Sequence, residues 1–473
     1  RLLELGGVEA ESAAWLRLGQ LEDAAGDRAA AKAALQRAVI MEGPGSRAAQ
    51  LLENLSDSPH DWKLFASALA EHRPTDDSER VAAGLEVARI LADHCGDPEA
   101  AIEALEQRLV EGAANTRLRQ ELAARLRASG QYARAIEQAQ KVLAIEPLHE
   151  MIWRELAVTY ESTGREREAR IASLPLLVMG LADEGDRRRI QAVERRPAKV
   201  RPKSLRRAVL AQLGTPRPED AAAGALLEAL GPALTKLYPP ELQSYGLATR
   251  DRLPAEANHP LREIANRIGA ALDISHFDLF LHRIRNRSVT IELGAHPALL
   301  VPAMVMEKDP STQAFLLAGP MIQIARGYQA VEKLTPRELD VLLASAARLV
   351  DPEFGSGLTS EEFLNEQAKR LQRAIPRRDR RAVHDAAIAY SKARRVKFDR
   401  WVQATERTAT RAALLLCDDL EPLVTELQSR VQPELDAEGE TFKTHPAFVD
   451  ALKFWASPAA MHLREHMGLL PPP

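Results

Sequence analysis

Apolar and small residues recur along the first part of the chain with a helical period, and the pattern itself repeats. Three glycines lie 34 residues apart and each is followed five residues later by alanine: Gly96, Gly130 and Gly164, then Ala101, Ala135 and Ala169. Small residues at these places let two antiparallel helices approach closely, and large residues fill the space to the next pair. No single pair can bury its apolar face alone. The pattern therefore predicts stacked helical pairs over residues 1–182.

The fullest unit of this pattern begins at Met151. Its order of large and small residues is Trp153, Leu156, Ala157, Tyr160, Gly164 and Ala169. Earlier units repeat parts of it with Leu122, Ala123, Gly130, Ala135 and Pro147, and with Trp15, Leu18, Gly19, Gly26, Ala31, Leu35 and Ala38. This order resembles the tetratricopeptide repeat (TPR). Residues 44–80 fit poorly and are interpreted as a degenerate unit.

The TPR resemblance implies a curved α-solenoid whose concave face, formed by the first helix of each unit, binds peptides. In this register seven polar side chains point into the face: Gln20, Glu86, Arg117, Gln120, Arg127, Arg154 and Glu161. The resemblance implies a protein or peptide partner, but the charges have both signs and so indicate no ligand class. The alternative interpretation is that they are ordinary solvated positions, the default for charged residues on helices.

Residues 183–208 are polar and basic, with Arg187-Arg188-Arg189, Arg195-Arg196-Pro197 and Arg201-Pro202-Lys203. Two prolines and few apolar residues predict a linker. A second basic stretch covers residues 373–400. Basic runs can bind nucleic acid or acidic lipid, and such binding stays an alternative. No aromatic residue is interleaved in the linker for base stacking, so solvated segments are the favoured interpretation.

Residues 209–473 are expected to form an α+β domain. Short β-branched and aromatic runs within residues 276–294 and 299–325 predict a small sheet. Helical patterns surround it at residues 260–272, 336–349, 360–374, 381–391, 397–417, 420–430 and 445–454. Two of them start with capping-box patterns, at residues 335–338 and 359–362. The predicted fold class is mainly α: a helical solenoid followed by helices around a small sheet.

Three segments of the second domain share an order with a known family. Residues 313–328 contain Gly-Pro-Met-Ile-Gln-Ile-Ala-Arg-Gly, residues 338–349 read Glu-Leu-Asp-Val-Leu-Leu-Ala-Ser-Ala-Ala-Arg-Leu, and residues 406–411 read Glu-Arg-Thr-Ala-Thr-Arg. They resemble the strand, the zinc-binding helix and the last ligand segment of gluzincin metallopeptidases of the HtpX and CAAX-prenyl-protease type. The resemblance covers about residues 260–430 and implies a peptide-binding strand edge beside residues 313–325.

The side chains that would hold and use zinc are missing from these segments. A zinc peptidase helix carries two His four residues apart and a Glu that activates water. Here those places are Ser345, Ala346 and Leu349, with Glu406 alone at the last ligand place. A hydroxyl and an alkyl group cannot replace two imidazoles, and alanine cannot take a proton. The sequence predicts a degenerate zincin-type domain with no catalytic residues, metal or cofactor.

Two histidine groups keep a functioning metallohydrolase open as an alternative. His462-Leu463-Arg464-Glu465-His466 has the inverted zinc spacing, but only seven residues follow it to supply a third ligand. His384 lies between the two peptidase-like helices, where a lone His is usually a surface residue. The alternative requires His384, Glu406 and the His462/His466 pair to converge on one point.

Composition narrows the classes of function. The 473 residues are 45% apolar, 27% charged and only 4% aromatic, with a formal net charge of -4, which gives no global attraction to nucleic acid or membrane.

Cys95 and Cys417 belong to no CxxC pair, which favours a reducing, cytoplasmic location. No apolar run is long enough to predict a membrane span. The chain begins at Arg1 without a Met, so it is interpreted as a mature product or a piece of something longer, and further repeats are expected upstream. The favoured hypothesis is a non-enzymatic protein-interaction scaffold.

Overall fold

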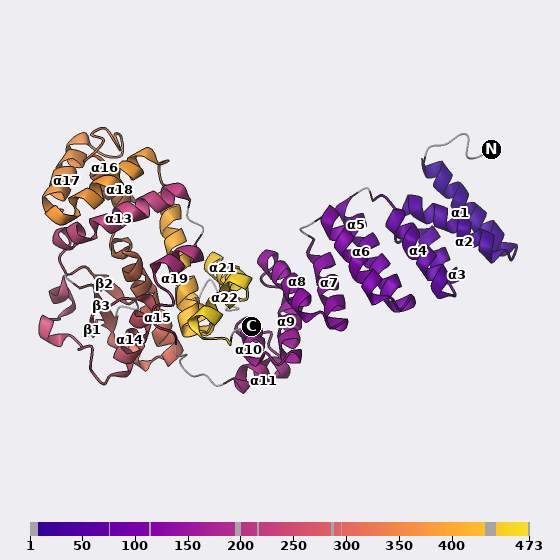
Figure 1. Cartoon of the computed structure of the whole chain (residues 1–473), viewed down its shortest axis with the longest axis horizontal. Coiled ribbons are helices and arrows are strands. Elements are labelled where there is room, and N and C mark those ends of the chain that lie inside the picture. Colours follow the sequence, from indigo (N-terminus) through magenta and orange to yellow (C-terminus); the bar gives the residue numbers. More distant parts are fainter. Residues whose placement is uncertain are drawn as a thin grey trace. The chain divides into compact units, whose positions relative to one another are not determined.

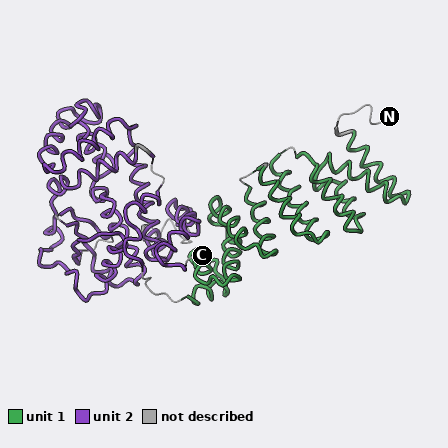
Figure 2. The backbone as a smooth tube through the Cα atoms, in the orientation of Figure 1, with its two compact units in different colours: residues 1–193 green, residues 194–473 purple. Residues whose placement is uncertain are grey.

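The computed structural model of the chain describes residues 8–74, 76–112, 115–193, 200–214, 217–284, 288–294, 296–430 and 441–471. The chain divides into two compact units, residues 1–193 and residues 194–473 (Figure 2). The prediction of a mainly helical fold with a small sheet is confirmed. Within the described ranges, no helix is both long and apolar enough to cross a membrane.

Unit 1 is a series of helices joined by short turns (Figure 1). Its helices are α1 (Val8–Ala24), α2 (Arg28–Glu42), α3 (Arg47–Leu55), α4 (Pro59–Glu71), α5 (Asp77–Arg89), α6 (Pro98–Glu111), α7 (Thr116–Ala128), α8 (Tyr132–Ile145), α9 (Glu150–Ser162), α10 (Glu166–Val178) and α11 (Glu184–Ala192). A single π-helical turn, η1 (Ile90–His94), extends α5. The poorly fitting residues 44–80 form α3, α4 and the start of α5.

The spaced glycines and alanines of the repeat have distinct structural roles. Gly96, Gly130 and Gly164 have φ of 64°, 76° and 72°, a left-handed conformation that glycine adopts without steric cost. They end the first helix of three successive pairs. The alanines five residues later are 0%, 3% and 1% exposed, where the second helix packs on the first. The prediction of stacked helical pairs is confirmed.

Part of the expected linker belongs to unit 1. Residues 184–192 form α11, which packs on α10. Asp183 and Asp186 start this helix with a capping box, and Ile190 is buried. Residues 194–199, including Arg195 and Arg196, lie outside the described ranges. The division between the units therefore falls after residue 193 rather than after residue 182.

Unit 2 surrounds a three-stranded sheet with helices (Figure 1). The strands are β1 (Asp278–His282), β2 (Thr290–Glu292) and β3 (Ala298–Pro302). The helices are α12 (Arg207–Leu210), α13 (Pro218–Leu237), α14 (Pro260–Leu272), α15 (Pro310–Arg326), α16 (Pro336–Ala347), α17 (Glu361–Ala374), α18 (Arg380–Lys392), α19 (Phe398–Cys417), α20 (Glu421–Arg430), α21 (Pro446–Trp455) and α22 (Pro458–Met467). Helices α14 and α16 to α21 follow the seven predicted helical patterns within two residues at each end, whereas no helix was predicted at α12, α13 or α15.

The sheet has the order β1-β3-β2. Strand β1 is parallel to β3, with Asp278 opposite Ala298, and β2 is antiparallel to β3. On one face, Phe280 and Leu300 form a small buried cluster against which Tyr245 packs. The sheet predicted within residues 276–294 is thus present.

The predicted strand at residues 313–325 is wrong, because these residues lie in α15. Asp309 caps the helix, Pro310 occupies its first turn, and Gly327 ends it with φ of 74°. These are strong helix boundary signals. Gly319 and Pro320 do not interrupt the helix, and Pro320 lies inside it. The expected peptide-binding strand edge is therefore absent at residues 313–325.

The two predicted capping boxes have different outcomes. Thr335 and Glu338 form the expected box at α16. At α17 the cap is one residue later than expected, because Ser360, not Thr359, accepts the backbone N–H of Phe363 at 3.3 Å. Both signals nevertheless located a helix start.

Candidate protein-binding face of the repeat unit

The seven positions predicted to face the concave surface lie on the first helix of successive pairs. Gln20 is on α1, Glu86 on α5, Arg117, Gln120 and Arg127 on α7, and Arg154 and Glu161 on α9. The spacings of three, seven and ten residues on α7, and of seven on α9, place these side chains on one side of each helix. In the structure these seven side chains differ in the partners that they contact.

The side chains of Gln20 and Glu86 form hydrogen bonds with neighbouring side chains on their own helices. The Gln20 Oε1 accepts a hydrogen bond from Arg17 at 3.4 Å. Both carboxylate oxygens of Glu86 accept from Arg89, at 3.0 and 2.6 Å. Arg89 also donates to Glu53 of α3 at 2.9 Å, so it ties α5 to the preceding pair. The carboxylate of Glu86 is therefore held in an ion pair within unit 1, with an arginine that it shares with Glu53.

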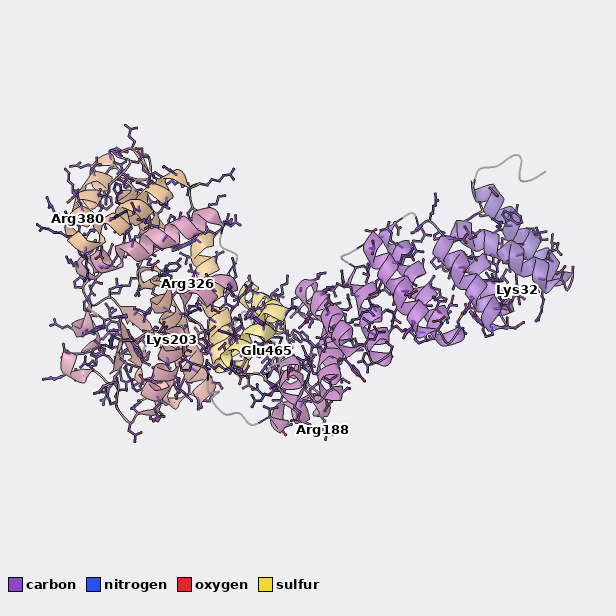
Figure 3. The ribbon with its side chains drawn as sticks, in the orientation of Figure 1. Lys32, Arg188, Lys203, Arg326, Arg380 and Glu465 are labelled. Carbon is purple, nitrogen blue, oxygen red and sulfur yellow. The ribbon has the colours of Figure 1, made fainter. Side chains whose placement is uncertain are left out.

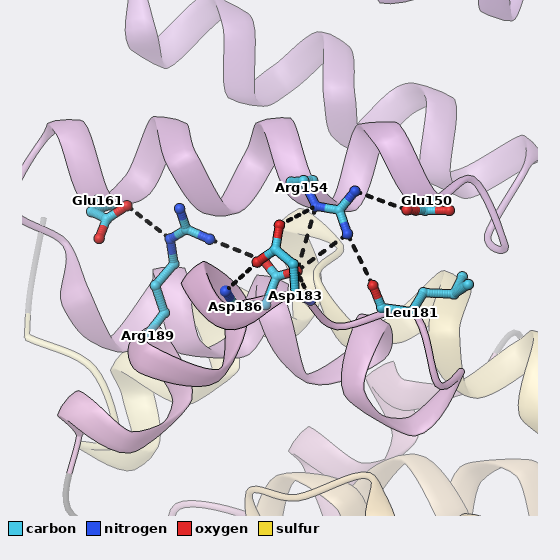
Figure 4. A network of polar contacts seen from close by, with 7 residues as sticks. All are labelled: Glu150, Arg154, Glu161, Leu181, Asp183, Asp186 and Arg189. Carbon is cyan, nitrogen blue, oxygen red and sulfur yellow. Dashed lines mark hydrogen bonds and ion pairs between the residues drawn. The ribbon is translucent and has the colours of Figure 1, made fainter.

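Arg154 and Glu161 are occupied by α11 (Figure 4). Arg154 donates to the Leu181 carbonyl at 2.9 Å and lies within 3.3 Å of both Asp183 and Asp186. Glu161 accepts from the Arg189 Nε at 2.8 Å. Helix α11 thus covers the same side of α9 on which a ligand was predicted.

The centre of this network is the buried Asp186 carboxylate. Asp186 is 0% exposed and contacts Arg154 through one oxygen and Arg189 through the other, the latter at 2.9 Å. Its Oδ2 also accepts the Asp183 backbone N–H at 3.1 Å. Two guanidinium groups compensate one desolvated carboxylate, which makes the contact between α9 and α11 specific.

The ionisation of the neighbouring residues follows from this geometry. The backbone N–H of Asp186 donates to Asp183 and lowers the pKa of Asp183 below its usual value. Burial opposes the charge of Arg154, but the hydrogen bond to Glu150 and the charges of Asp186 and Asp183 raise its pKa overall. The cap of α11 is stabilised while Asp183 is ionised, and this contribution is lost as the pH falls through the lowered pKa.

Helix α7 presents the remaining candidates. It carries four arginines and one acidic residue, Glu121, which pairs with Arg125 at 2.7 Å. Arg117 is exposed, and neither it nor Gln120 has a polar side-chain partner among the described residues. Arg127 is half-buried and faces Glu155 of α9; burial raises the pKa of Glu155, and the charge of Arg127 acts in the opposite direction. Positive charge is therefore in excess on α7.

The predicted peptidase positions lie in or against a hydrophobic core. Ser345 and Ala346 are both 0% exposed. The Ser345 hydroxyl donates to the Val341 carbonyl at 2.7 Å, and Leu349 packs against the apolar cluster of α13, α16 and α18. Glu406 on α19 is exposed. A catalytic zinc site needs an open coordination position, and buried side chains occupy these places.

The residue after α16 has a structural role instead. Arg348 is buried and donates to the Phe354 carbonyl at 2.9 Å, to Asn365 at 2.9 Å and to Glu361 at 2.7 Å. It thereby fixes the loop between α16 and α17. In this chain the helix that resembles a zinc-binding helix organises a helical core.

The histidines of the alternative metal site are on the surface of unit 2. His384 is exposed on α18, and His462 and His466 are exposed on α22. His384 lies 3.7 Å from Asp385, and His462 lies 3.7 Å from Glu465. No group of three or more His, Cys, Asp or Glu side chains in the described part of the chain could hold a metal ion. The convergence required by the metallohydrolase hypothesis is not present among these residues.

Sequence reasoning missed Asp186 and Arg189, which organise the end of the repeat unit. It assigned both to a linker because three consecutive arginines dominate that segment. The available signal was Asp183-Glu184-Gly185-Asp186, an acidic residue followed three positions later by another, as at a capped helix start. Pairing of Asp186 with Arg154 across 32 residues carries no local signal.

The fold and this face define a helical-repeat protein. No family model and no curated protein sequence matches the chain. A crystal structure of MamA protein is similar to part of it, with 17% identity and a TM-score of 0.25, over 38% of this chain and 94% of that one. A second MamA crystal structure has 17% identity and a TM-score of 0.20, over 40% of this chain and 82% of its own.

Proposed function

We propose that the chain is a protein-interaction scaffold whose repeat unit binds an acidic segment of a partner protein along α7. The observation that carries the proposal is the charge balance on the first helices of the pairs. The acidic candidates Glu86 and Glu161 are held in ion pairs with Arg89 and Arg189, whereas Arg117 is exposed without an acidic partner among the described residues. The charge on α7 that no ion pair engages is positive, so the partner preferred by this helix is acidic.

The size of the face fits a short peptide. Arg117 and Arg127 are ten residues apart, which corresponds to about 15 Å along a helix and to about five residues of extended chain. Arg117 supplies an exposed guanidinium for a carboxylate, and Gln120 supplies an amide for a main-chain group. Helix α11 closes the corresponding side of α9, so α7 is the proposed binding helix.

Site-specific photo-crosslinking tests this proposal. A benzophenone amino acid in place of Gln120, introduced into the full chain in its native cells, is expected to capture a protein in a protease-sensitive, nuclease-resistant adduct. The matched control replaces Gln107, an exposed glutamine on α6, the second helix of its pair. Identical adducts from both positions, or nuclease-sensitive adducts from Gln120, contradict the proposal.

We further propose that unit 2 has no metallopeptidase activity and serves as a second interaction module. Support comes from Ser345, Ala346 and Leu349, whose side chains are packed where zinc ligands and the general base are required. The full chain with added Zn²⁺ is expected to leave an unfolded casein substrate intact. Cleavage that a chelator abolishes, and that Glu406→Gln removes while His384→Ala does not, contradicts this.

A further inference from the structure

Two exposed histidines lie side by side where β1 and β3 begin. The parallel register places Asp278 opposite Ala298, and the Asp278 backbone N–H donates to the Pro297 carbonyl at 2.9 Å. His276 and His296 lie two residues before this register pair, just ahead of the two strands. The ring centroids are 5.4 Å apart, with 50° between the ring planes.

This separation is slightly larger than that of two imidazoles that share one metal ion. With a metal–nitrogen bond of about 2.0 to 2.1 Å and a ring centre roughly 1.1 Å behind the nitrogen, two rings at neighbouring positions have centres about 4.5 to 5.1 Å apart. The observed 5.4 Å is within a few tenths of an ångström of this range. Both side chains are exposed, so small torsional changes suffice to close the difference.

The two imidazole rings are not committed to other polar interactions among the described residues. Neither His276 nor His296 has a hydrogen-bond or ion-pair partner among the described residues. The carboxylate of Asp278, two residues after His276, is engaged with Arg252 at 3.2 Å. The site therefore offers two imidazole nitrogens, and water completes the coordination.

We propose that His276 and His296 form a surface binding site for a late first-row divalent metal ion of the class of Ni²⁺, Cu²⁺ and Zn²⁺. Imidazole ligands select these ions over Mg²⁺ and Ca²⁺, which prefer oxygen. An ion held by both residues links the starts of β1 and β3, so its binding stabilises the folded sheet. The proposal concerns binding and assigns no catalytic role to the ion.

Calorimetric titration of the full chain with Ni²⁺ tests the site. The background is the His462→Ala/His466→Ala variant, because these exposed residues four apart on α22 could also bind the ion. One Ni²⁺ per chain is expected. His276→Ala and His296→Ala should each weaken binding at least tenfold, because each removes one of two ligands. His384→Ala, an exposed histidine outside the pair, is the matched control and should bind as the background does.

A second readout separates loss of ligand from loss of fold. Ni²⁺ should raise the urea midpoint of the background protein and leave that of His276→Ala and His296→Ala unchanged, while circular dichroism shows all variants folded. The proposal is overturned if the background binds no Ni²⁺, if either single variant binds as tightly as the background, or if His384→Ala reproduces the loss.

Discussion

Asp186→Ala is expected to detach α11 from the repeat unit. The substitution removes the carboxylate shared by Arg154 and Arg189 and breaks the capping box with Asp183. Removing one partner of a buried ion pair typically costs about 3 to 5 kcal/mol. Arg154 keeps Glu150, Asp183 and the Leu181 carbonyl, so the lower end of this range applies here.

Hydrogen exchange measured by mass spectrometry checks this prediction. Peptides covering residues 184–192 should lose protection by roughly two orders of magnitude in Asp186→Ala, since each factor of ten corresponds to about 1.4 kcal/mol. Glu184→Ala is the matched control, an exposed acidic residue of the same first turn, and should change protection little. Equal protection of α11 in both variants contradicts the assigned role of Asp186.

Arg464→Met is expected to destabilise unit 2 by about 3 kcal/mol, because it removes a buried guanidinium together with its hydrogen bonds to a buried carbonyl and to a carboxylate. Arg464 is 0% exposed and donates to the Trp455 carbonyl at 2.6 Å and to Asp418 at 3.3 Å. Its guanidinium also lies 4.2 Å from the Trp455 ring centroid. Methionine keeps the aliphatic volume but loses all three contacts.

Urea unfolding followed by circular dichroism and tryptophan fluorescence measures this effect. The midpoint should fall in Arg464→Met, and the native fluorescence should change because the cation above Trp455 is gone. His462→Ala, on the exposed side of the same helix, should leave the midpoint within experimental error. If both variants unfold at the wild-type midpoint, Arg464 does not hold α22 in place.

The repeat unit was predictable because its signals are local. Glycine at positive φ and alanine at a helix contact are constrained by their immediate geometry, so Gly130 and Ala135 mark a helical pair in any sequence that forms one. The same holds for the capped start of α16 at Thr335 and Glu338. For the same reason the bounds of α14 and of α16 to α21 were predicted within two residues.

The errors arose where tertiary packing overrides local pattern. Residues 310–326 contain Gly319 and Pro320, which favour a break, yet α15 continues through them and packs against α14 and α19. The sequence also did not show which charged side chains of the candidate face remain available for a ligand. Glu161 and Arg154 become unavailable through Arg189 and Asp186, and those partners are known only once α11 is folded against α9.

The most direct test of the proposed acidic partner is charge reversal at the exposed arginine of α7. Once the protein captured from Gln120 is identified, its binding to the purified full chain should weaken at least tenfold in Arg117→Glu and should fall steeply with added salt. The matched control is Arg380→Glu, an exposed arginine on α18 of unit 2 (Figure 3), which should bind as the wild type does. Unchanged affinity in Arg117→Glu, or an equal loss in Arg380→Glu, contradicts recognition of an acidic segment by α7.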